Sequence, residues 1–264
     1  MFRNSITVLL FTCSLFIMVG CEHDQEIDPE QDHLVQISFS AQPLSGSLLK
    51  STGSQEENLI SKVILFGVNE QGVVIHTFPN LPASGTQLII SRKVKTLYAI
   101  ANPTDALANA DPANVSGLMD MTIDFANAPK SPFVMSCIKE VNISTTANIN
   151  LEFVRTVAKI NVTGTVDFQI TKVVVSNVTS KAYVFSRNTF SVPSSTKATY
   201  SDNGSNPVIY IAENSKSSPV KVTVTGVFQE EAGDYDFTIT SGKSNIDIIR
   251  NTSYQVNVRV EYED

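Results

Sequence analysis

Apolar and polar residues alternate along the stretch from Val141 to Val162, and the alternation changes phase once. From Val141 to Phe153 the apolar residues occupy odd positions, a pattern that predicts one long strand with a buried face. From Val154 they occupy even positions. A one-residue shift turns every later side chain to the other face of a sheet, so a single flat strand cannot satisfy both halves. Either a β-bulge absorbs the extra residue, or one sandwich ends here and a second begins. We favour the second interpretation because comparable strand-rich lengths lie on either side.

Shorter stretches before this point alternate in the same way, and the cleanest covers residues 35–41. Further strands are predicted at residues 62–68, 72–75, 88–90 and 95–101. Residues 104–121 are the best helical candidate, although Pro112 and Gly117 keep any helix short. Residues 43–58, rich in Ser, Gly and Glu, are expected to form a loop.

The second half of the chain is predicted to be strand and turn throughout. Strands are expected at residues 154–162, 171–176, 182–185, 208–212, 220–227, 235–240 and 253–262. Residues 193–207 form a long polar loop in this interpretation, and residues 230–234 form a hairpin connection. Short strands at regular spacing are typical of a β-sandwich, so an all-β fold is predicted.

The composition agrees with this fold and limits the partners. The chain of 264 residues contains no Trp, and its charged content is 17%. The formal net charge is -7, and it becomes -8 if a signal peptide containing only Arg3 is removed. An acidic chain with no basic cluster is a poor match for nucleic acid, so no nucleic-acid partner is expected.

The first twenty residues have the features of a bacterial secretion signal. Arg3 precedes an apolar run over residues 6–20, which is too short to span a bilayer stably. The run ends in Met18-Val-Gly-Cys21, which resembles the lipobox of bacterial lipoproteins. The resemblance implies that Cys21 carries lipid, which would hold the protein at a membrane. The alternative is a plain secretory signal with an incidental Cys.

The segment over residues 21–32 is predicted to be an extended tether. Six acidic residues, Pro29 and no Lys or Arg make it self-repelling and unable to pack a core. It also resembles the acidic export signal of lipoproteins that reach the outer face of the outer membrane.

No constellation of residues points to catalysis. His76 is the only His expected in a folded domain, and no metal-ligand spacing surrounds it. Cys137 lies in an apolar run and is expected to be a buried, inert thiol. Residues 202–206 lack the full spacing of a calcium loop and predict a polar turn. We therefore expect no enzymatic activity, no metal and no cofactor.

Four stretches, taken in order, resemble a known family. Arg155-Thr-Val-Ala-Lys-Ile-Asn-Val162 is similar to the "R-x-V-A-K-I-x-V" segment of the fimbrillins, the lipoprotein-derived type V pilins of gut and oral anaerobes. Similar matches occur at Leu97-Tyr-Ala-Ile-Ala-Asn-Pro103, Tyr210-Ile-Ala-Glu-Asn214 and Arg250-Asn-Thr-Ser-Tyr-Gln-Val-Asn-Val258. The resemblance implies two tandem transthyretin-like β-sandwich domains, which we place at residues 33–153 and 154–264.

The resemblance also implies a structural role at the cell surface. Fimbrillins are pilus subunits that support adhesion, and their partners are other fimbrial subunits and, through the lipid on Cys21, the outer membrane. Stalk subunits of the family are cut after an Arg behind the first strand, and the cut frees a groove for a neighbour's strand. The displaced strand here would carry Val35, Ile37, Phe39 and Ala41.

The maturation step departs from the family pattern, because the chain has no Arg between Arg3 and Arg92. Lys50 is then the candidate cleavage residue, for a different protease. Alternatively, the subunit keeps its lipid and acts as an anchor or terminator. Stalk, anchor and tip roles stay open at this point.

The C-terminal strand is the candidate donor. Its apolar residues alternate with polar ones without an error, at Tyr254, Val256, Val258, Val260 and Tyr262. The simpler interpretation is an edge strand that completes the second sandwich, and we expect that state in the isolated subunit. The alternative function is a monomeric surface lipoprotein that binds glycan or a host protein, although the absence of Trp disfavours glycan capture.

Overall fold

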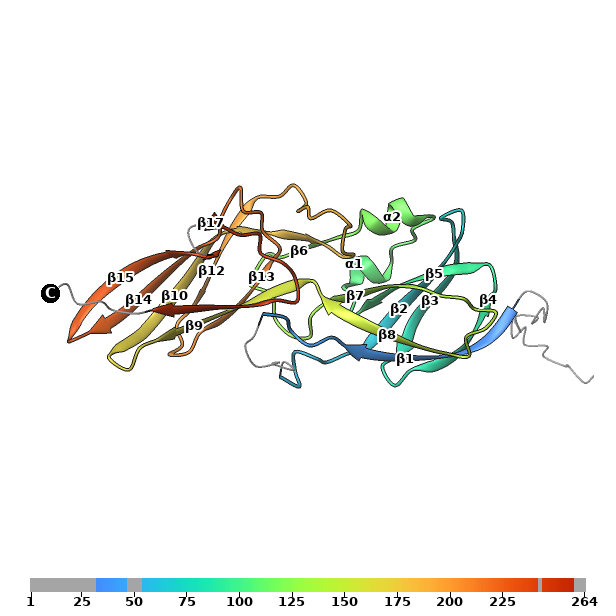
Figure 1. Cartoon of the computed structure of the whole chain (residues 1–264), viewed down its shortest axis with the longest axis horizontal. Coiled ribbons are helices and arrows are strands. Elements are labelled where there is room, and N and C mark those ends of the chain that lie inside the picture. The colour runs from blue at the N-terminus through green and yellow to red at the C-terminus, as the bar shows by residue number, and fades with distance from the viewer. Residues whose placement is uncertain (1–31, 47–53, 242–243, 259–264) are drawn as a thin grey trace, which may run out of the picture.

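The computed structural model describes residues 32–46, 54–241 and 244–258. The molecule is elongated, with two β-rich lobes lying end to end (Figure 1). The all-β fold predicted from the sequence is confirmed. Among the described residues, no helix is long and apolar enough to cross a membrane.

The first lobe is built from one curled sheet with strand order β3-β2-β5-β7-β8-β1-β4. Its strands all contribute side chains to one apolar core, so the sheet folds over on itself as a sandwich. The strands are β1 (Asp32–Ala41), β2 (Lys62–Asn69), β3 (Val74–Pro82), β4 (Thr86–Ser91), β5 (Val94–Ala101), β7 (Met135–Glu140) and β8 (Asn148–Arg155).

The second lobe packs two sheets around its own core. One has the order β12-β10-β14-β15 and the other β13-β9-β18. A small hairpin joins β16 (Thr240–Ser241) to β17 (Ser244–Asn245). The strands of the two larger sheets are β9 (Val157–Gly164), β10 (Phe168–Thr179), β12 (Lys197–Asp202), β13 (Val208–Ala212), β14 (Lys221–Phe228), β15 (Glu231–Thr238) and β18 (Ser253–Val258).

The change of phase lies between β8 and β9, where Thr156 interrupts the pairing. The first core ends at Phe153 and the second begins at Ala158. Buried apolar residues occupy odd positions from Ile149 to Val157 and even positions from Ala158 to Val162, and Thr156 between the two runs is buried as well. The chain therefore turns its other face inward as it passes from one lobe to the next.

A third apolar cluster covers the outer face of β2 and β5, and it draws on both halves of the sequence. It contains α1 (Asp105–Ala108), α2 (Val115–Met119) and β6 (Thr122–Asp124), together with Val184 and Phe185. β6 pairs with β11 (Lys181–Tyr183) from the second half. The division into domains 33–153 and 154–264 therefore stays a prediction, because the two halves interlock at this face.

The helical prediction over residues 104–121 resolves into these two short helices. Thr104 caps α1, where its hydroxyl accepts the N–H of Leu107, and Asn114 caps α2, where its side chain accepts the N–H of Gly117. Pro112 lies between them, where a missing N–H prevents a continuous helix.

Three predictions of local structure were wrong. The long strand over residues 141–153 is broken, because the N–H groups of Thr145 and Thr146 both bond to the carbonyl of Asn142. Ile143 lies in that turn and is buried. Because its position is odd, it fits the alternating pattern although it is not part of a strand. β7 and β12 were missed, the latter inside a predicted loop. The β14–β15 turn lies at Gln229 and Glu230, which both have positive φ, so Glu231 already belongs to a strand.

Candidate functional site

Strand β1 lies inside the first sheet, between β8 and β4. It runs parallel to β8, with Ile37 opposite Ile149 and Ala41 opposite Phe153, and antiparallel to β4. Val35 and Ile37 are fully buried in the first core. The candidate displaced residues Val35, Ile37, Phe39 and Ala41 thus share the inward face, as the alternation predicted. Removing β1 would expose the core and two strand edges.

After β1, residues 42–45 pass through the junction between the lobes. The N–H of Gln42 bonds to the carbonyl of Phe153 at 2.8 Å, which extends the pairing with β8. Leu44 is 5% exposed, so its side chain is enclosed at the junction. Ser45 forms a parallel bridge with Thr252, the residue just before β18. The segment therefore contacts both lobes.

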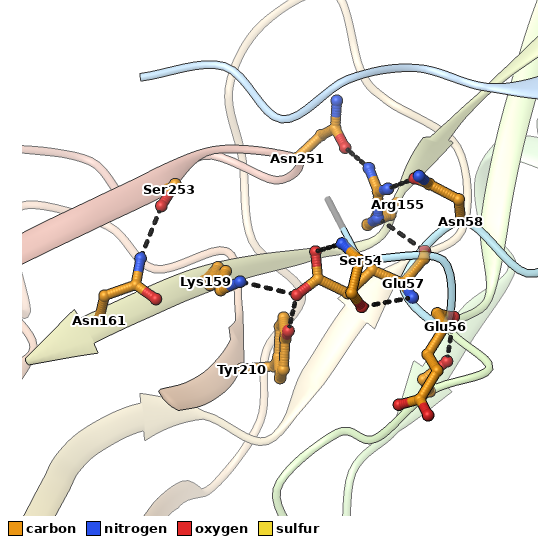
Figure 2. Close-up of polar contacts among 11 residues, drawn as sticks. Ser54, Glu56, Glu57, Asn58, Arg155, Lys159, Asn161, Tyr210, Asn251 and Ser253 are labelled. Atoms are coloured by element: carbon orange, nitrogen blue, oxygen red, sulfur yellow. Dashed lines mark hydrogen bonds and ion pairs between the residues drawn. The ribbon is translucent and has the colours of Figure 1, made fainter. Parts of the chain in front are cut away.

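After residues 47–53, which lie outside the described part of the chain, residues 54–58 form a compact hook. The carboxylate of Glu57 accepts the N–H of Ser54 at 3.2 Å, and the hydroxyl of Ser54 accepts the N–H of Glu57 at 3.2 Å. This reciprocal arrangement is that of a capping box. It turns the carboxylate of Glu57 toward Lys159 and Tyr210 of the second lobe (Figure 2).

Arg155, the last residue of β8, is completely buried between the hook and the C-terminal segment. Its Nε donates to the carbonyl of Glu57 at 3.0 Å, and its Nη1 donates to the side-chain oxygen of Asn251 at 2.6 Å (Figure 2). Nη2 donates to the side chain of Asn58, and Nη1 also donates to the carbonyl of Gln42 at 2.8 Å. The guanidinium group therefore joins three chain segments that are distant in the sequence.

Glu57 supplies a negative charge beside the two cations Arg155 and Lys159. Burial lowers the pKa of Arg155, and the nearby carboxylate of Glu57 opposes that shift. Burial alone would raise the pKa of Glu57, but hydrogen bonds from Lys159 and Tyr210 outweigh it, and its pKa lies below the ordinary value. Burial and the bond to Glu57 raise the pKa of Tyr210. Glu57 is thus held as an anion that neutralises Lys159 at 2.7 Å.

Glu57→Gln is expected to lower the free energy of unfolding by about 1.5–3 kcal/mol near neutral pH, because hydrogen bonds to a charged group are lost. A depressed folded-state pKa contributes stability above the unfolded value, and that stability disappears as pH falls through the folded value. The difference from wild type should therefore be constant above the ordinary pKa of 4.5 and shrink below it. Urea unfolding across pH measures it.

Glu56→Gln is the matched control, since Glu56 is exposed next to Glu57. Surface changes of this kind usually stay within about 0.5 kcal/mol. Equal effects of the two substitutions, or a loss for Glu57→Gln that does not change below the ordinary pKa, would contradict the role given to Glu57.

Each of the other stretches that resemble fimbrillin segments also places a polar side chain in the interior. Asn102, at φ 52°, follows β5, and its amide bonds to Ser61, to the carbonyl of Leu59 at 2.7 Å and to that of Phe133 at 2.8 Å. Asn214 follows β13, and its side-chain oxygen accepts the hydroxyl of Thr179 at 2.7 Å. These bonds fix the chain where strands end.

Arg250 fastens the segment that crosses from the second lobe to the first. It forms a 2.6 Å ion pair with Glu213, and both residues are largely buried. Its Nη1 and Nη2 donate to the carbonyls of Val184 and Tyr183, each at 2.8 Å. Val184 belongs to the cluster over β2 and β5, so Arg250 and Arg155 tie the lobes together at two separate places.

The candidate donor strand is β18, which occupies the edge of the β13-β9-β18 sheet. It pairs in parallel with β9, and Tyr254, Val256 and Val258 turn toward the second core. Val258 is 1% exposed. Val260 and Tyr262 lie outside the described residues, as do the lipidation residue Cys21 and the candidate cleavage residue Lys50.

The remaining candidate residues have structural surroundings. Burial raises the pKa of Cys137 to about 11, and the thiol is unpaired in the interior. His76 is half-buried, its Nε2 accepts the N–H of Ser91 at 3.1 Å, and burial lowers its pKa. The carboxylate of Asp202 accepts the N–H of Gly204 at 2.7 Å, as in an ordinary polar turn. Among the described residues, no group of three His, Cys, Asp or Glu could hold a metal ion.

Solved structures of bacterial surface proteins show the same architecture. A candidate cell adhesion protein from Bacteroides eggerthii superposes with a TM-score of 0.61 and 14% identity, over 88% of this chain and 87% of its own. A fimbrial assembly protein from Parabacteroides distasonis gives 0.60 and 17%, over 86% and 91%. The C-terminally truncated tip fimbrial protein Mfa3 from Porphyromonas gingivalis gives 0.60 and 13%, over 88% and 96%. The chain has the fold of these proteins.

This likeness agrees with the fimbrillin resemblance of the sequence at the level of fold. No family model matches the sequence, and no curated protein matches it either. Below 20% identity the shared fold does not by itself assign a role.

Three residues of the junction were not found by sequence reasoning. Gln42 and Leu44 lie in a stretch whose composition predicts a loop, and nothing in their neighbourhood marks them as enclosed. Glu57 did carry a signal, because Ser54-Gln-Glu-Glu57 has the spacing of a capping box. That pattern fixes the local turn but does not identify Lys159 as its partner.

Proposed function

We propose that this protein is a structural subunit of a bacterial surface fimbria that supports adhesion, is lipid-anchored at the outer membrane and assembles by strand exchange. The observation that carries the proposal is the position of β1. The first strand of the described chain lies inside a sheet, and residues 47–53, outside the described part, link it and the segment 42–46 to the rest of the chain. The fold shared with fimbrial proteins supports the same role.

Loss of β1 would create a groove suited to another strand. Full burial of Val35 and Ile37 is worth about 1.5–3 kcal/mol for each side chain. The partly buried Phe39 adds less, and a replacement strand would gain this energy. The edges of β8 and β4 would present unpaired N–H and C=O groups, which give affinity to an added strand. The pockets vacated by every second side chain of β1 would accept apolar side chains of the added strand. The groove would thus accept a neighbour's strand in place of β1.

Two routes to assembly follow from whether the chain is cut at Lys50. A protease that cuts after Lys50 would leave β1 held only by non-covalent contacts. The N-terminal fragment, which carries both β1 and the lipid on Cys21, could then dissociate. Without the cut, the subunit would keep its lipid and β1, and would anchor or end a fimbria. The two routes differ in whether the mature protein begins before or after residue 50, which N-terminal sequencing of protein from the cell surface decides.

The candidate donor strand also has to leave its present place. β18 completes the second core through Tyr254, Val256 and Val258, so a donor role requires it to separate from β9. In the proposal, the cost of that separation is offset by burial in the neighbour's groove. Val260 and Tyr262 extend the same alternation beyond the described residues.

Deleting residues 21–50 should produce concentration-dependent polymers, seen as ladders on mild gels, because the groove is then empty. Val260→Asp in the same protein should abolish them by placing a charge in an apolar pocket. Val260 is chosen over Val258, whose side chain is buried in the second lobe itself. Asn257→Asp, on the exposed side of β18, is the control and should leave the ladders intact.

The alternative function has one structural feature in its favour. A pocket of about 510 Å³ lies beside the junction, and it is lined in part by Phe133, Tyr210, Lys130 and Asp202. Aromatic and polar groups of this kind can hold a sugar ring. A shortened protein that stays monomeric and retains a soluble glycan, with binding lost in Asp202→Ala, would favour this role over assembly.

Cys21→Ala tests the anchoring part of the proposal independently. The substitution should shift the full-length protein from the membrane fraction to the soluble fraction, or block its processing, because the acyl attachment point is gone. Labelling with a fatty-acid analogue should mark the wild type and not the variant. Wild-type protein that takes up no label would contradict lipid anchoring.

A further inference from the structure

We infer that the cleft now filled by residues 42–45 is the part of the acceptor groove that sets the register of an incoming strand. It would take the end of an extended segment from a neighbouring subunit of the same fold, with an apolar side chain at the position of Leu44. Arg155 and Asn251 would hold the main chain of that segment. This inference rests on the proposed function, since it describes which strand can replace β1.

The cleft recognises main-chain atoms. Arg155 Nη1 donates to the carbonyl of Gln42, and Asn251 Nδ2 donates to the carbonyl of Pro43, each at 2.8 Å. The N–H of Ser45 bonds to the carbonyl of Asn251 at 2.9 Å, and the carbonyl of Ser45 accepts the N–H of Ser253 at 2.8 Å. None of these bonds depends on the side chains of residues 42 or 43, so a different sequence could make them.

One position in the segment, that of Leu44, requires an apolar side chain because it is enclosed. Leu44 is 5% exposed and lies three residues after Ala41, the last residue of β1. Its neighbours Pro43 and Ser45 are less buried. The odd-numbered pattern of β1 ends here, because Leu44 is inward at an even position. A replacement strand fills the position of Leu44 only if an apolar residue follows its last inward residue by three positions, which fixes how far it can slide. The candidate donor Tyr254–Tyr262 of this chain alternates without such a shift, so the cleft favours the strand of a different fimbrial subunit of the same fold.

Arg155 and Asn251, which bind the main chain of the segment, would stay in place after it leaves. Arg155 is still bonded to the carbonyl of Glu57 and to the side chain of Asn58. The main-chain N–H of Asn251 remains bonded to the carbonyl of Val157 at 2.7 Å, and its side-chain oxygen to Arg155. Donors already aimed at the end of the groove would then lack acceptors.

An incoming strand that stops at the position of Ala41 leaves these donors to water and forgoes both the bonds to them and the apolar burial at the position of Leu44. A strand that continues through the cleft gains both. The cleft therefore distinguishes full-length donors in the correct register from shorter or shifted ones, which alternating pockets alone cannot do.

The test replaces residues 47–53 of the chain from residue 21 with the recognition sequence of a site-specific protease. After cleavage, labelled synthetic peptides are added to compete with the N-terminal fragment for its groove. Fluorescence anisotropy follows the binding and the dissociation of each peptide. The first peptide covers residues 32–46. The second stops at Ala41. The third covers residues 32–46 with Leu44→Asp.

We expect the first peptide to exchange into the protein, and the second and third to dissociate at least tenfold faster than the first. Equal dissociation of all three peptides would overturn the role of the cleft while leaving strand exchange intact. If no peptide, including the first, displaces the fragment under any tested condition, the proposed function itself fails. The two failures are thus distinguishable.

Asn251→Asp tests the recognition from the protein side, because it keeps the oxygen that Arg155 contacts and removes the donor to Pro43. It should speed dissociation of the first peptide and leave the second unchanged. Asn142→Asp, an exposed change in a turn of the first lobe, is the control and should alter neither. An equal effect of Asn251→Asp on both peptides would indicate general loosening of the groove and would contradict the inference.

Discussion

Arg155→Ala is expected to lower the free energy of unfolding by about 3–5 kcal/mol, as is typical when a buried charged group in a network is removed. The side chain is completely buried and donates to acceptors on three segments. Its loss would leave carbonyls of Gln42 and Glu57 without that donor and would open a cavity between the lobes. Urea denaturation monitored by tyrosine fluorescence gives the change.

Arg187→Ala is the matched control for this prediction. Arg187 also bonds to a carbonyl and to Asp120, but its side chain is 29% exposed and its ion pair faces solvent. Exposed pairs are worth about 0–1 kcal/mol, so a small effect is expected there. A loss below about 1 kcal/mol for Arg155→Ala would show that the junction does not depend on the buried guanidinium group.

Ile37→Ala should be the most damaging single change within β1, at about 2–5 kcal/mol, because Ile37 is fully buried between β8 and β4. The substitution removes apolar contacts and leaves a cavity in the first core. Ser38→Ala, at the exposed neighbouring position, should change stability little. Thermal unfolding of both variants measures the difference.

The same substitution bears on assembly. A weakened β1 should leave its groove more readily, so protein cut between residues 47 and 53 should lose its N-terminal fragment faster when it carries Ile37→Ala. If the fragment is released at the same rate from both proteins, the inward face of β1 does not control its release.

Strands with one buried face could be predicted from the sequence, because alternation follows directly from their geometry. β13 was predicted with its observed bounds, Val208–Ala212, and the alternation of β1 and β18 gave their inward faces correctly. β7 and β12 do not follow this rule. β7 begins with three consecutive buried residues, and β12 buries only Tyr200 among polar neighbours, so neither shows an alternating pattern.

The junction was less predictable, for a physical reason. Arg155 stood out through its resemblance to a fimbrillin segment, but its partners lie far away in the sequence, with Asn251 96 positions later and Glu57 98 positions earlier. Periodicity and spacing describe local geometry only. Pairings between remote loops become visible when the fold brings them together.

Disulfide trapping in polymers of the shortened protein tests strand exchange most directly. Asn150 on β8 is exposed and its side chain contacts Ser38 of β1, so Asn150→Cys reports what occupies that position. A second cysteine is placed in turn at the outward positions Gln255 and Asn257 of β18. The shortened protein, expressed without residues 1–20, lacks both Cys13 and Cys21, and Cys137 is buried.

Strand exchange predicts disulfide-linked ladders that need both engineered cysteines, because bonded cysteines must approach within about 7 Å between Cα atoms. Mixing two single-cysteine proteins should give linked dimers, which shows that the bond joins different molecules. Polymers that form without any such link at either β18 position, or a protein that stays monomeric at high concentration, would contradict the proposal that β18 of one subunit replaces β1 of the next.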